Sequence, residues 1–323
     1  MFSFGKSKRT ASIVIDDYVI RMVENNGKDL ESLRIAAEKP IPNNIIVNGR
    51  IVDEPEFYEF MKTTVQEWGI RNRSVRFFVP QSLIILREIE LPEDVKKEKV
   101  KEYIQFEIGN TIHFPFKNPI FDIYKEGTQS NKVTVLAAPE DELLKYTHTF
   151  ADVSLKPTAA EIQPLGIYRY FLHTQPDSHE EKVYMIVEYN LSSVNISVFY
   201  KHRVEFLRHQ PLPLSKDYWE YNEEIAAYEF TGDSIRYQGE IEDQLNEIDR
   251  LRNFYRFSIH HGEKEVNELL IVGDSPELIK IAELIKQRFN LSTRVLEVEE
   301  QINGNPIQSS FIPALGLALR GGK

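Results

Sequence analysis

The sequence predicts an α/β fold made of two or three compact units. Segments rich in β-branched residues alternate along the chain with segments whose apolar residues recur at helical spacing, as is typical of α/β proteins. The 323 residues are too many for one ordinary hydrophobic core. A strand–turn–strand pattern at residues 11–24 returns at residues 183–200, so the two halves of the chain begin alike.

The N-terminal segment predicts a β-hairpin followed by a helix. Residues 11–15 and 19–24 are apolar, β-branched runs on either side of a polar turn at 16–18. Residues 53–69 have an acidic, proline-led start, apolar residues at helical spacing and a glycine at the end, which together predict a helix. Two more strands are expected after it, at residues 74–79 and 83–90.

Residues 87–157 predict a separate small α/β unit. Its first helix is expected to begin after Pro92 and to end at Gly109. A strand at 132–138 and a second helix from 139 to 153 follow, the latter with Leu144 on its apolar side. Four lysines form a basic face on the first helix, which is interpreted as a solvated face or, alternatively, as a partner surface: Lys96, Lys97, Lys99 and Lys101.

The second half repeats the strand-rich opening and then alternates helices with one more strand. Strands are expected at residues 183–188, 194–200, 203–208 and 268–272. Apolar residues from Ile241 to Ile259 predict a helix between the last two of these strands. Ser275 is a candidate N-cap for the next helix, with Pro276 as its first residue. An apolar helix at 313–319 closes the chain.

The composition excludes several classes of protein. The chain has no cysteine, which excludes a disulfide framework, a thiol nucleophile and any cysteine-ligated metal site. A formal net charge of −11 argues against a general nucleic-acid-binding protein, so no nucleic acid is expected as a partner. The apolar runs are far shorter than the roughly 18 residues of a membrane span, and no secretory signal precedes the first strand. A cytoplasmic location is therefore expected.

The common motifs of nucleotide, nucleophilic and zinc chemistry are absent from the sequence. It contains no G-x-x-x-x-G-K-[ST], no G-x-G-x-x-G, no G-x-S-x-G and no H-E-x-x-H. His260 and His261 are adjacent at a predicted helix end, where neighbouring side chains point apart and no carboxylate stands at ligand spacing. No metal site is expected.

Four stretches in order carry a resemblance to a known family and span most of the chain. They are residues 41–53 (IPNNIIVNGRIVD), residues 87–92 with the following helix and Ile112-His113-Phe114-Pro115, residues 247–258, and residues 313–320 (PALGLALR). The sequence resembles type IV pilus assembly proteins of the PilM type, relatives of the division protein FtsA in the actin-like ATPase superfamily.

This resemblance implies a two-lobed actin-like fold with subdomains called 1A, 1C, 2A and 2B. Subdomain 1A would comprise residues 1–86 and 158–181, with residues 309–323 packing back on it. Residues 87–157 would be the inserted subdomain 1C, and residues 182–308 would form 2A and 2B. The two strand–turn–strand openings would then be two phosphate loops that face each other across a nucleotide cleft.

The first of these loops departs from the family pattern, which reads Asp-Ile-Gly-Ser. Val14 stands at the aspartate position and Asp16 at the glycine position, followed by Asp17. Glycine lets backbone N–H groups approach a phosphate, whereas two carboxylates at that place repel it.

The other two loops depart from the pattern as well. The family's second loop reads Asp-Ile-Gly with a later Thr, and here the residues at those places include Glu188, Asn190 and Val194. The family's third loop has Gly-Gly, and here the corresponding pair is Gly273-Asp274. With a glycine missing from all three loops, no catalytic residue, no metal and no cofactor are expected. Binding of ATP with Mg²⁺, as an active actin-like ATPase coupled to pilus assembly, is the alternative.

The resemblance further implies a non-catalytic scaffold at the cytoplasmic face of the membrane. Its partner would be a PilN-like single-span membrane protein, bound through its cytoplasmic N-terminal tail in a groove between 1A and 1C; self-association is also open. The expected groove residues are Leu83, Ile85, Arg87, Phe106, Phe114, Pro115 and Phe116. Phe114 and Phe116 could equally anchor their loop on the 1C sheet. A third possibility is an FtsA-type division protein, against which the absence of a C-terminal amphipathic helix counts.

Overall fold

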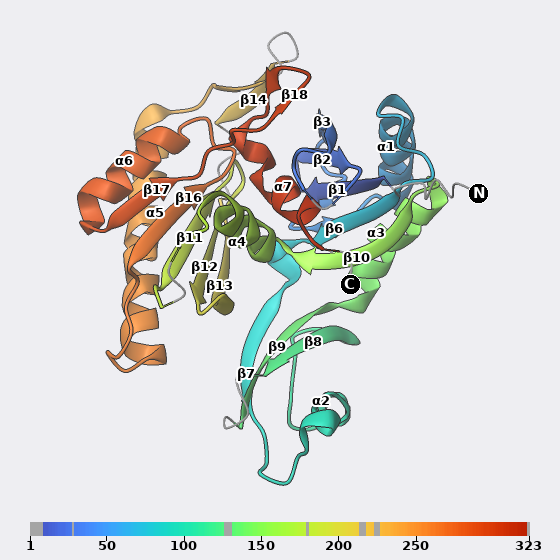
Figure 1. The fold of residues 1–323 in the computed structure, drawn as a ribbon. Helices are drawn as coiled ribbons and strands as arrows, with labels where there is room; N and C mark the ends of the chain where they lie inside the picture. The colour runs from blue at the N-terminus through green and yellow to red at the C-terminus, as the bar shows by residue number, and fades with distance from the viewer. Residues whose placement is uncertain are drawn as a thin grey trace.

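Two five-stranded sheets with the same topology form the body of the molecule (Figure 1). The computed structural model describes residues 9–27, 29–125, 131–178, 181–212, 218–222 and 227–321. The first sheet has the order β10-β6-β1-β2-β3 and the second the order β17-β16-β11-β12-β13. In each, a three-stranded antiparallel meander is extended by two parallel strands. The likeness of the two openings therefore extends through the whole of each sheet.

The strand bounds follow the predicted ones closely where a prediction existed. The first sheet contains β1 (Thr10–Ile15), β2 (Val19–Asn25), β3 (Leu33–Pro40), β6 (Ser74–Val79) and β10 (Lys156–Ile162). The second contains β11 (Tyr184–Tyr189), β12 (Ser193–Tyr200), β13 (Arg203–Pro211), β16 (Glu268–Val272) and β17 (Ser292–Val295). Short hairpins are formed by β4 (Ile46–Val47) with β5 (Arg50–Ile51), β14 (Trp219–Asn222) with β15 (Ala227–Phe230), and β18 (Gln301–Ile302) with β19 (Asn305–Pro306).

Two helices cover one face of the first sheet, α1 (Glu54–Glu67) and α3 (Glu140–Asp152). The α1 helix begins as predicted, since the Asp53 side chain accepts a hydrogen bond from the Glu56 N–H at 3.0 Å. Phe150 of α3 packs edge-on against Phe77 of the sheet, with ring centroids 5.1 Å apart. The α3 helix, expected within the inserted unit, is thus part of the first lobe. Leu144 on this helix is 44% exposed and does not face the core as expected.

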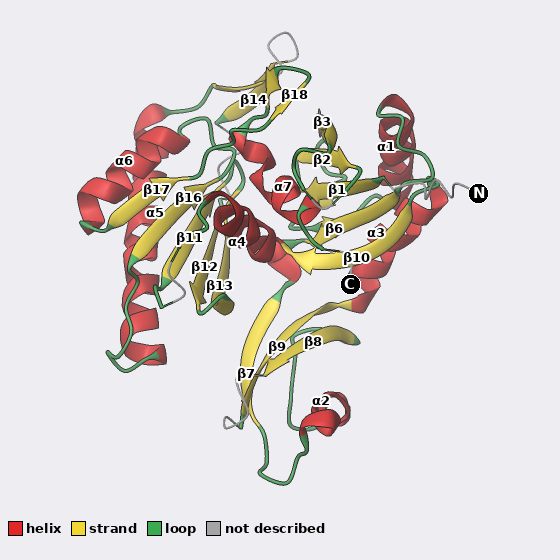
Figure 2. Ribbon diagram, viewed as in Figure 1, coloured by secondary structure: helices red, strands yellow, loops and turns green. Residues whose placement is uncertain are grey.

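Helices α4 (Gln163–Thr174) and α7 (Ile312–Ala318) lie between the two sheets and share a core with both (Figure 2). The two helices approach at a pair of glycines: a Cβ on Gly316 would lie 1.8 Å from the carbonyl oxygen of Gly166. Backbones this close exclude any side chain at that crossing. The sequence analysis predicts no helix at residues 163–174, which form α4 in the structure.

Helices α5 (Ser234–Asn253) and α6 (Leu278–Phe289) cover the outer face of the second sheet. A π-helical segment, Phe254–Ile259, extends α5. Ser275 does not cap α6 as predicted. Its carbonyl accepts a hydrogen bond from the Leu278 N–H at 3.0 Å in a preceding turn, and the helix begins at Leu278. Within the described ranges, each helix is too short or too polar to cross a bilayer.

The third unit, called the insert here, comprises residues 85–139 and hangs below the two lobes (Figure 1). Its sheet has the order β7-β9-β8, with β7 (Ile85–Glu90), β8 (Pro119–Lys125) and β9 (Lys132–Pro139). Helix α2 (Val100–Glu107) covers one face. It begins later than expected, because the residues after Pro92 form a turn and then a 3-10 helix, Lys97–Lys99. Of the predicted basic face, Lys99 forms an ion pair with Glu102 at 2.7 Å.

Candidate functional site

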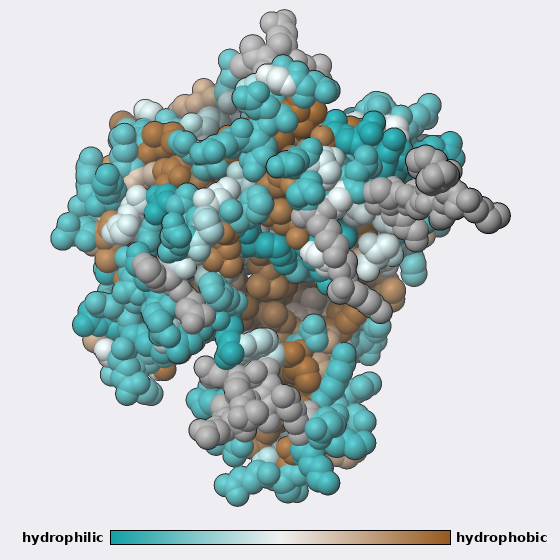
Figure 3. Space-filling view, in the orientation of Figure 1, coloured by the Kyte–Doolittle hydropathy of each residue, from teal (hydrophilic) through white to brown (hydrophobic). Residues whose placement is uncertain are grey.

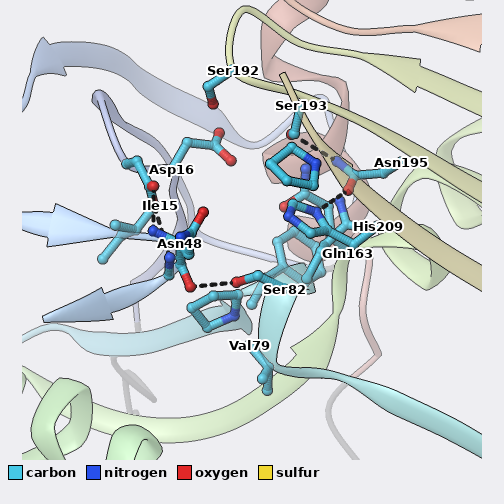
Figure 4. Close-up of a pocket in the computed structure, with 16 residues that line it drawn as sticks. Ile15, Asp16, Asn48, Val79, Ser82, Gln163, Ser192, Ser193, Asn195 and His209 are labelled. Atoms are coloured by element: carbon cyan, nitrogen blue, oxygen red, sulfur yellow. Dashed lines mark hydrogen bonds between the residues drawn. The ribbon is translucent and has the colours of Figure 1, made fainter. Parts of the chain in front are cut away.

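The β1–β2 turn and the β11–β12 turn face each other between the lobes, as predicted for the two phosphate loops. Asp16 and Asp17 of the first turn and Ser192 and Ser193 of the second line one narrow cavity of about 40 Å³ (Figure 4). A second cavity of about 10 Å³ lies deeper, between Asp16 and Glu188. Pockets for small molecules usually have volumes of roughly 300–1,000 Å³, so side chains fill most of the space that such a ligand needs.

The two aspartates of the first turn have different surroundings. The Asp17 carboxylate accepts hydrogen bonds from the backbone N–H groups of Asn48 at 2.6 Å and Gly49 at 2.8 Å, which ties the β4–β5 hairpin to the turn. Asp16 points into the cleft, and burial together with the nearby Asp274 and Glu188 carboxylates raises its pKa well above the ordinary value. Both carboxylates stand where a phosphate loop would present N–H groups.

A buried ion pair joins the lobes at the back of the cleft. Arg21 of β2 donates from Nη2 to Asp274 Oδ2 at 2.8 Å, and these side chains are 6% and 5% exposed. Arg21 also bonds to Glu38 of β3 and lies 4.0 Å from Asp16. The Tyr18 hydroxyl donates to the same Asp274 oxygen at 2.5 Å. Two side chains of the first lobe, Arg21 and Tyr18, therefore bind one carboxylate of the second lobe.

Glu188, at the end of β11, is the centre of a second polar cluster across the cleft. It accepts hydrogen bonds from Gln81 Nε2 at 2.5 Å and from Gln163, both in the first lobe. It also accepts from Asn190 Nδ2 at 3.1 Å in its own lobe. Burial raises its pKa, although these hydrogen bonds act in the opposite direction.

The remaining predicted cleft residues have structural roles. Val14 and Gly273 line the deeper cavity, whereas Val194 points into the core of the second lobe. At Gly273, with φ +143°, a Cβ would lie 2.0 Å from the Tyr189 carbonyl oxygen. This glycine therefore allows two backbones to meet.

The sequence analysis missed the four side chains that bind Asp274 or Glu188 from across the cleft: Arg21, Tyr18, Gln81 and Gln163. Arg21 had a signal, an arginine between the apolar pairs Val19-Ile20 and Met22-Val23. The two glutamines had none, because their partner Glu188 is distant in sequence. The lining of the cleft does not suit a nucleotide phosphate, because carboxylates and closely packed side chains occupy the place where a phosphate would lie.

A larger groove lies between the insert and the body. It has a volume of about 480 Å³, and apolar surface gathers in the hollow between the lower unit and the two lobes (Figure 3). The insert contributes residues of β8 and β9, and the body contributes residues of β10 and α4. The apolar lining comprises Val79, Ile84, Ile120, Phe121, Leu136, Ala137, Ala138, Leu143, Ala160, Ile162 and Leu165.

The groove predicted between 1A and 1C thus exists, but the seven residues expected to form it lie elsewhere. Leu83 is buried, and Phe106, at 73% exposed, lies on α2 away from the groove lining. Phe114 packs on the core of the insert, with Phe116 stacked on its ring at 5.7 Å. The Arg87 guanidinium lies 5.6 Å from the Phe114 ring. Ile85 and Pro115 also lie outside the lining.

The physical reason is the strand order of the insert sheet, in which β7 and β8 lie on opposite sides of β9. Arg87 and Val135 are register partners in the insert sheet, and their side chains share the face that α2 and Phe114 cover. The groove instead lies along β8, the edge strand beyond β9.

Among the described residues, no group of three histidines or carboxylates is placed to hold a metal ion.

Comparison with known proteins agrees with this architecture. Residues 13–230 match the model of a protein family described as type IV pilus assembly protein PilM. No curated protein matches the sequence significantly.

Solved structures share the fold at low sequence identity. A structure described as the PilM–PilN type IV pilus biogenesis complex matches with a TM-score of 0.74 and 17% identity, over 96% of this chain and 98% of the other. The cytoplasmic domain of EpsL from the type II secretion system of Vibrio cholerae matches with a TM-score of 0.51 and 9% identity, over 98% and 96% of the two chains. The ethanolamine utilization protein EutJ from Carboxydothermus hydrogenoformans matches with a TM-score of 0.50 and 12% identity, over 97% and 89%. The two-lobed actin-like α/β fold is confirmed.

Proposed function

Because the chain belongs to the family of type IV pilus assembly proteins PilM, we propose that it is a scaffold of a pilus assembly platform that does not hydrolyse ATP. Its groove between the insert and the body would bind the cytoplasmic N-terminal tail of a PilN-like, single-span membrane protein. That partner would hold the chain at the cytoplasmic face of the inner membrane. The family match favours this function over that of a division protein.

The observation that carries the proposal is the apolar groove itself. Its volume of about 480 Å³ exceeds that of the cleft cavity by about tenfold. Ile120 is 47% exposed at its edge although it is a large aliphatic side chain. An exposed concave apolar surface between two edge strands suits an extended peptide with apolar side chains. The matched PilM–PilN complex supports a PilN-type partner.

The contacts of the cleft support a structural rather than a catalytic role between the lobes. Asp274 and Glu188 each bind side chains of the opposite lobe, so the space between the turns is closed by hydrogen bonds and ion pairs. A triphosphate at this place would have to separate these pairs and approach the Asp16 carboxylate. We therefore expect no binding of ATP.

Titration with a synthetic tail peptide tests the partner proposal. The peptide comprises the cytoplasmic residues of the PilN-like protein encoded in the same genome, and calorimetry measures its dissociation constant. Replacement of Ile120 and Leu136 by serine should weaken binding at least about tenfold, since each loses apolar contact area. Phe106→Ser is the matched control, because this exposed phenylalanine of the insert lies outside the groove. Absence of binding to the wild type, or equal loss in the control, would contradict the groove assignment.

Titration with Mg-ATP tests the second part of the proposal. We expect no heat of binding with the wild type or with Asp16→Gly, because the polar contacts of Asp274 and Glu188 remain in both. Saturable binding to the wild type, with hydrolysis that exceeds the background, would favour the active ATPase instead.

A further inference from the structure

β8 is an edge strand of the insert sheet, and its edge lies in the groove. Among the described strands, the order β7-β9-β8 leaves one side of β8 without a strand partner (Figure 1). Three consecutive residues of β8, Ile120, Phe121 and Asp122, line the groove. Side chains of consecutive residues in a strand point to opposite faces of the sheet. A run of three lining residues therefore places the edge of β8, and not one face alone, against the groove.

The hydrogen-bond pattern of the insert sheet shows which main-chain groups of β8 lie at this edge. The Glu140 N–H donates to the Asn118 carbonyl at 3.0 Å, so the even-numbered residues of β8 are those that exchange hydrogen bonds with β9. The Leu91 N–H donates to the Asn131 carbonyl at 2.7 Å, which assigns the odd-numbered residues of β9 to β7 and agrees with this pattern. The main-chain groups of the odd-numbered residues of β8 therefore point away from β9, toward the open edge.

Phe121 offers both of its main-chain groups at the open edge of β8. Pro119, two residues before it, has no N–H to donate. The N–H of Ile123, two residues after it, donates to Oδ1 of Asp122 at 2.9 Å. Phe121 has neither restriction, so its N–H and C=O can both bond to the main chain of another segment.

The opposite wall of the groove is also an edge strand, but its spacing is irregular. β10 lies at the end of the first sheet, and its register with β6 shifts between Pro157 and Ala159. Such a bulge bends a strand and disrupts the regular spacing of its hydrogen-bonding groups. β8 pairs with β9 in an unbroken register from Pro119 to Lys125. The edge of β8 is therefore the better template for a further strand.

One face of the insert sheet is apolar where it meets the groove. Ile120 is 47% exposed on this face, and Leu136 and Ala138 of β9 share it, because they are the register partners of Asp122 and Ile120. The face is turned toward the body, since Ala138 packs with residues of the first lobe. In a strand added beside β8, the residue opposite Phe121 would turn its side chain away from this face, and its two neighbours would turn theirs toward it.

Resting on the proposed function, we propose that the tail peptide binds as a fourth strand of the insert sheet, beside β8, and exchanges main-chain hydrogen bonds with Phe121. Main-chain pairing supplies affinity that does not depend on the peptide's sequence, and pockets for alternate side chains supply specificity. The tail should therefore carry apolar residues on both sides of the residue that pairs with Phe121, where they contact Ile120, Leu136 and the apolar wall of the body.

A scan of the tail peptide tests the pairing on the wild-type protein. Peptides N-methylated at one residue at a time lose single main-chain N–H groups, and calorimetry gives the dissociation constant of each. In a strand, the N–H groups of successive residues point to opposite edges. We expect methylation to weaken binding at least about tenfold at residues two apart, and by a smaller factor at the residue between them, because only alternate N–H groups face β8.

Two variants of Phe121 test whether β8 is the strand that pairs with the peptide. Phe121→Pro and its matched control Phe121→Ala lose the same aromatic ring, and only the proline variant also lacks the N–H at the edge. Proline is tolerated in an edge strand where its nitrogen faces outward, so both variants should keep the β8–β9 pairing. The unmodified peptide should bind Phe121→Pro at least about tenfold more weakly than Phe121→Ala. Thermal unfolding shows whether both variants fold, and the peptide scan decides the proposal if they do not.

The outcomes separate this inference from the proposed function. Alternating sensitivity in the scan, with weaker binding to Phe121→Pro than to Phe121→Ala, supports the added strand. If the peptide binds the wild type but methylation has no alternating effect, or if the two folded variants bind it equally, the strand assignment is wrong while the proposed function stands. If the peptide does not bind the wild type at all, the proposed function fails and this inference with it.

Discussion

The buried arginine of the cleft offers the sharpest test of how the lobes are held together. Arg21→Met removes the cation and keeps most of the side-chain volume, which leaves Asp274 and Glu38 buried or half-buried without their partner. At an effective dielectric constant of about 20, a pair of unit charges 4 Å apart interacts by about 4 kcal/mol. Removal of one partner from a buried pair typically costs about 3–5 kcal/mol. We expect a loss of unfolding free energy in that range.

Urea denaturation and differential scanning calorimetry measure this loss. Unfolding entropy near 60 °C is about 2.1 cal/mol/K per residue, so for this chain the expected loss corresponds to a fall in Tm of about 4–7 °C. Lys62→Met, which removes an exposed ion pair with Glu59, is the control and should leave Tm unchanged. The double variant Arg21→Met with Asp274→Asn should lose less unfolding free energy than the two single variants lose in sum, because Asp274→Asn removes the charge that Arg21→Met leaves uncompensated. A shift in Arg21→Met no larger than in the control would refute the reasoning.

Three further predictions concern other parts of the fold. Gly316→Ala places a Cβ 1.8 Å from a backbone carbonyl oxygen of α4 and should lower the free energy of unfolding by at least about 3 kcal/mol. Gly239→Ala in α5, where a Cβ would have nothing within 4 Å, should raise it by about 0.5–1 kcal/mol. Urea titration of both variants distinguishes the effect of the close contact from that of helix propensity. Burial and nearby carboxylates raise the pKa of Asp16, so the folded state binds more protons than the unfolded state. The free energy of unfolding of the wild type, relative to that of Asp16→Asn, should therefore fall as the pH rises from about 4. A difference between the two proteins that stays constant from about pH 4 to pH 7 would contradict this. Tyr146→Phe removes a buried hydrogen bond of 2.9 Å to the Gly49 carbonyl in the β4–β5 hairpin and should lower the free energy of unfolding by about 1 kcal/mol. Urea titration measures this loss, and an unchanged midpoint of unfolding would show that the bond contributes nothing to stability.

Much of the local structure was readable from the sequence alone. The hairpin turns, the start of α1 at Asp53 and the buried strand β16 were predicted within a residue or two, because strand propensity, turn residues and caps act between close neighbours in the chain. The departures of Asp16, Glu188 and Asp274 from a phosphate-binding pattern are also visible in the sequence. Residue type at a turn decides whether N–H groups or carboxylates face the cleft.

Only the tertiary structure decided which side chains meet. Arg21 and Asp274 lie near opposite ends of the chain, and nothing local to either specifies the other. The groove was expected in the right place with the wrong residues, because only the folded sheet shows that β8 and β9, and not β7, line it.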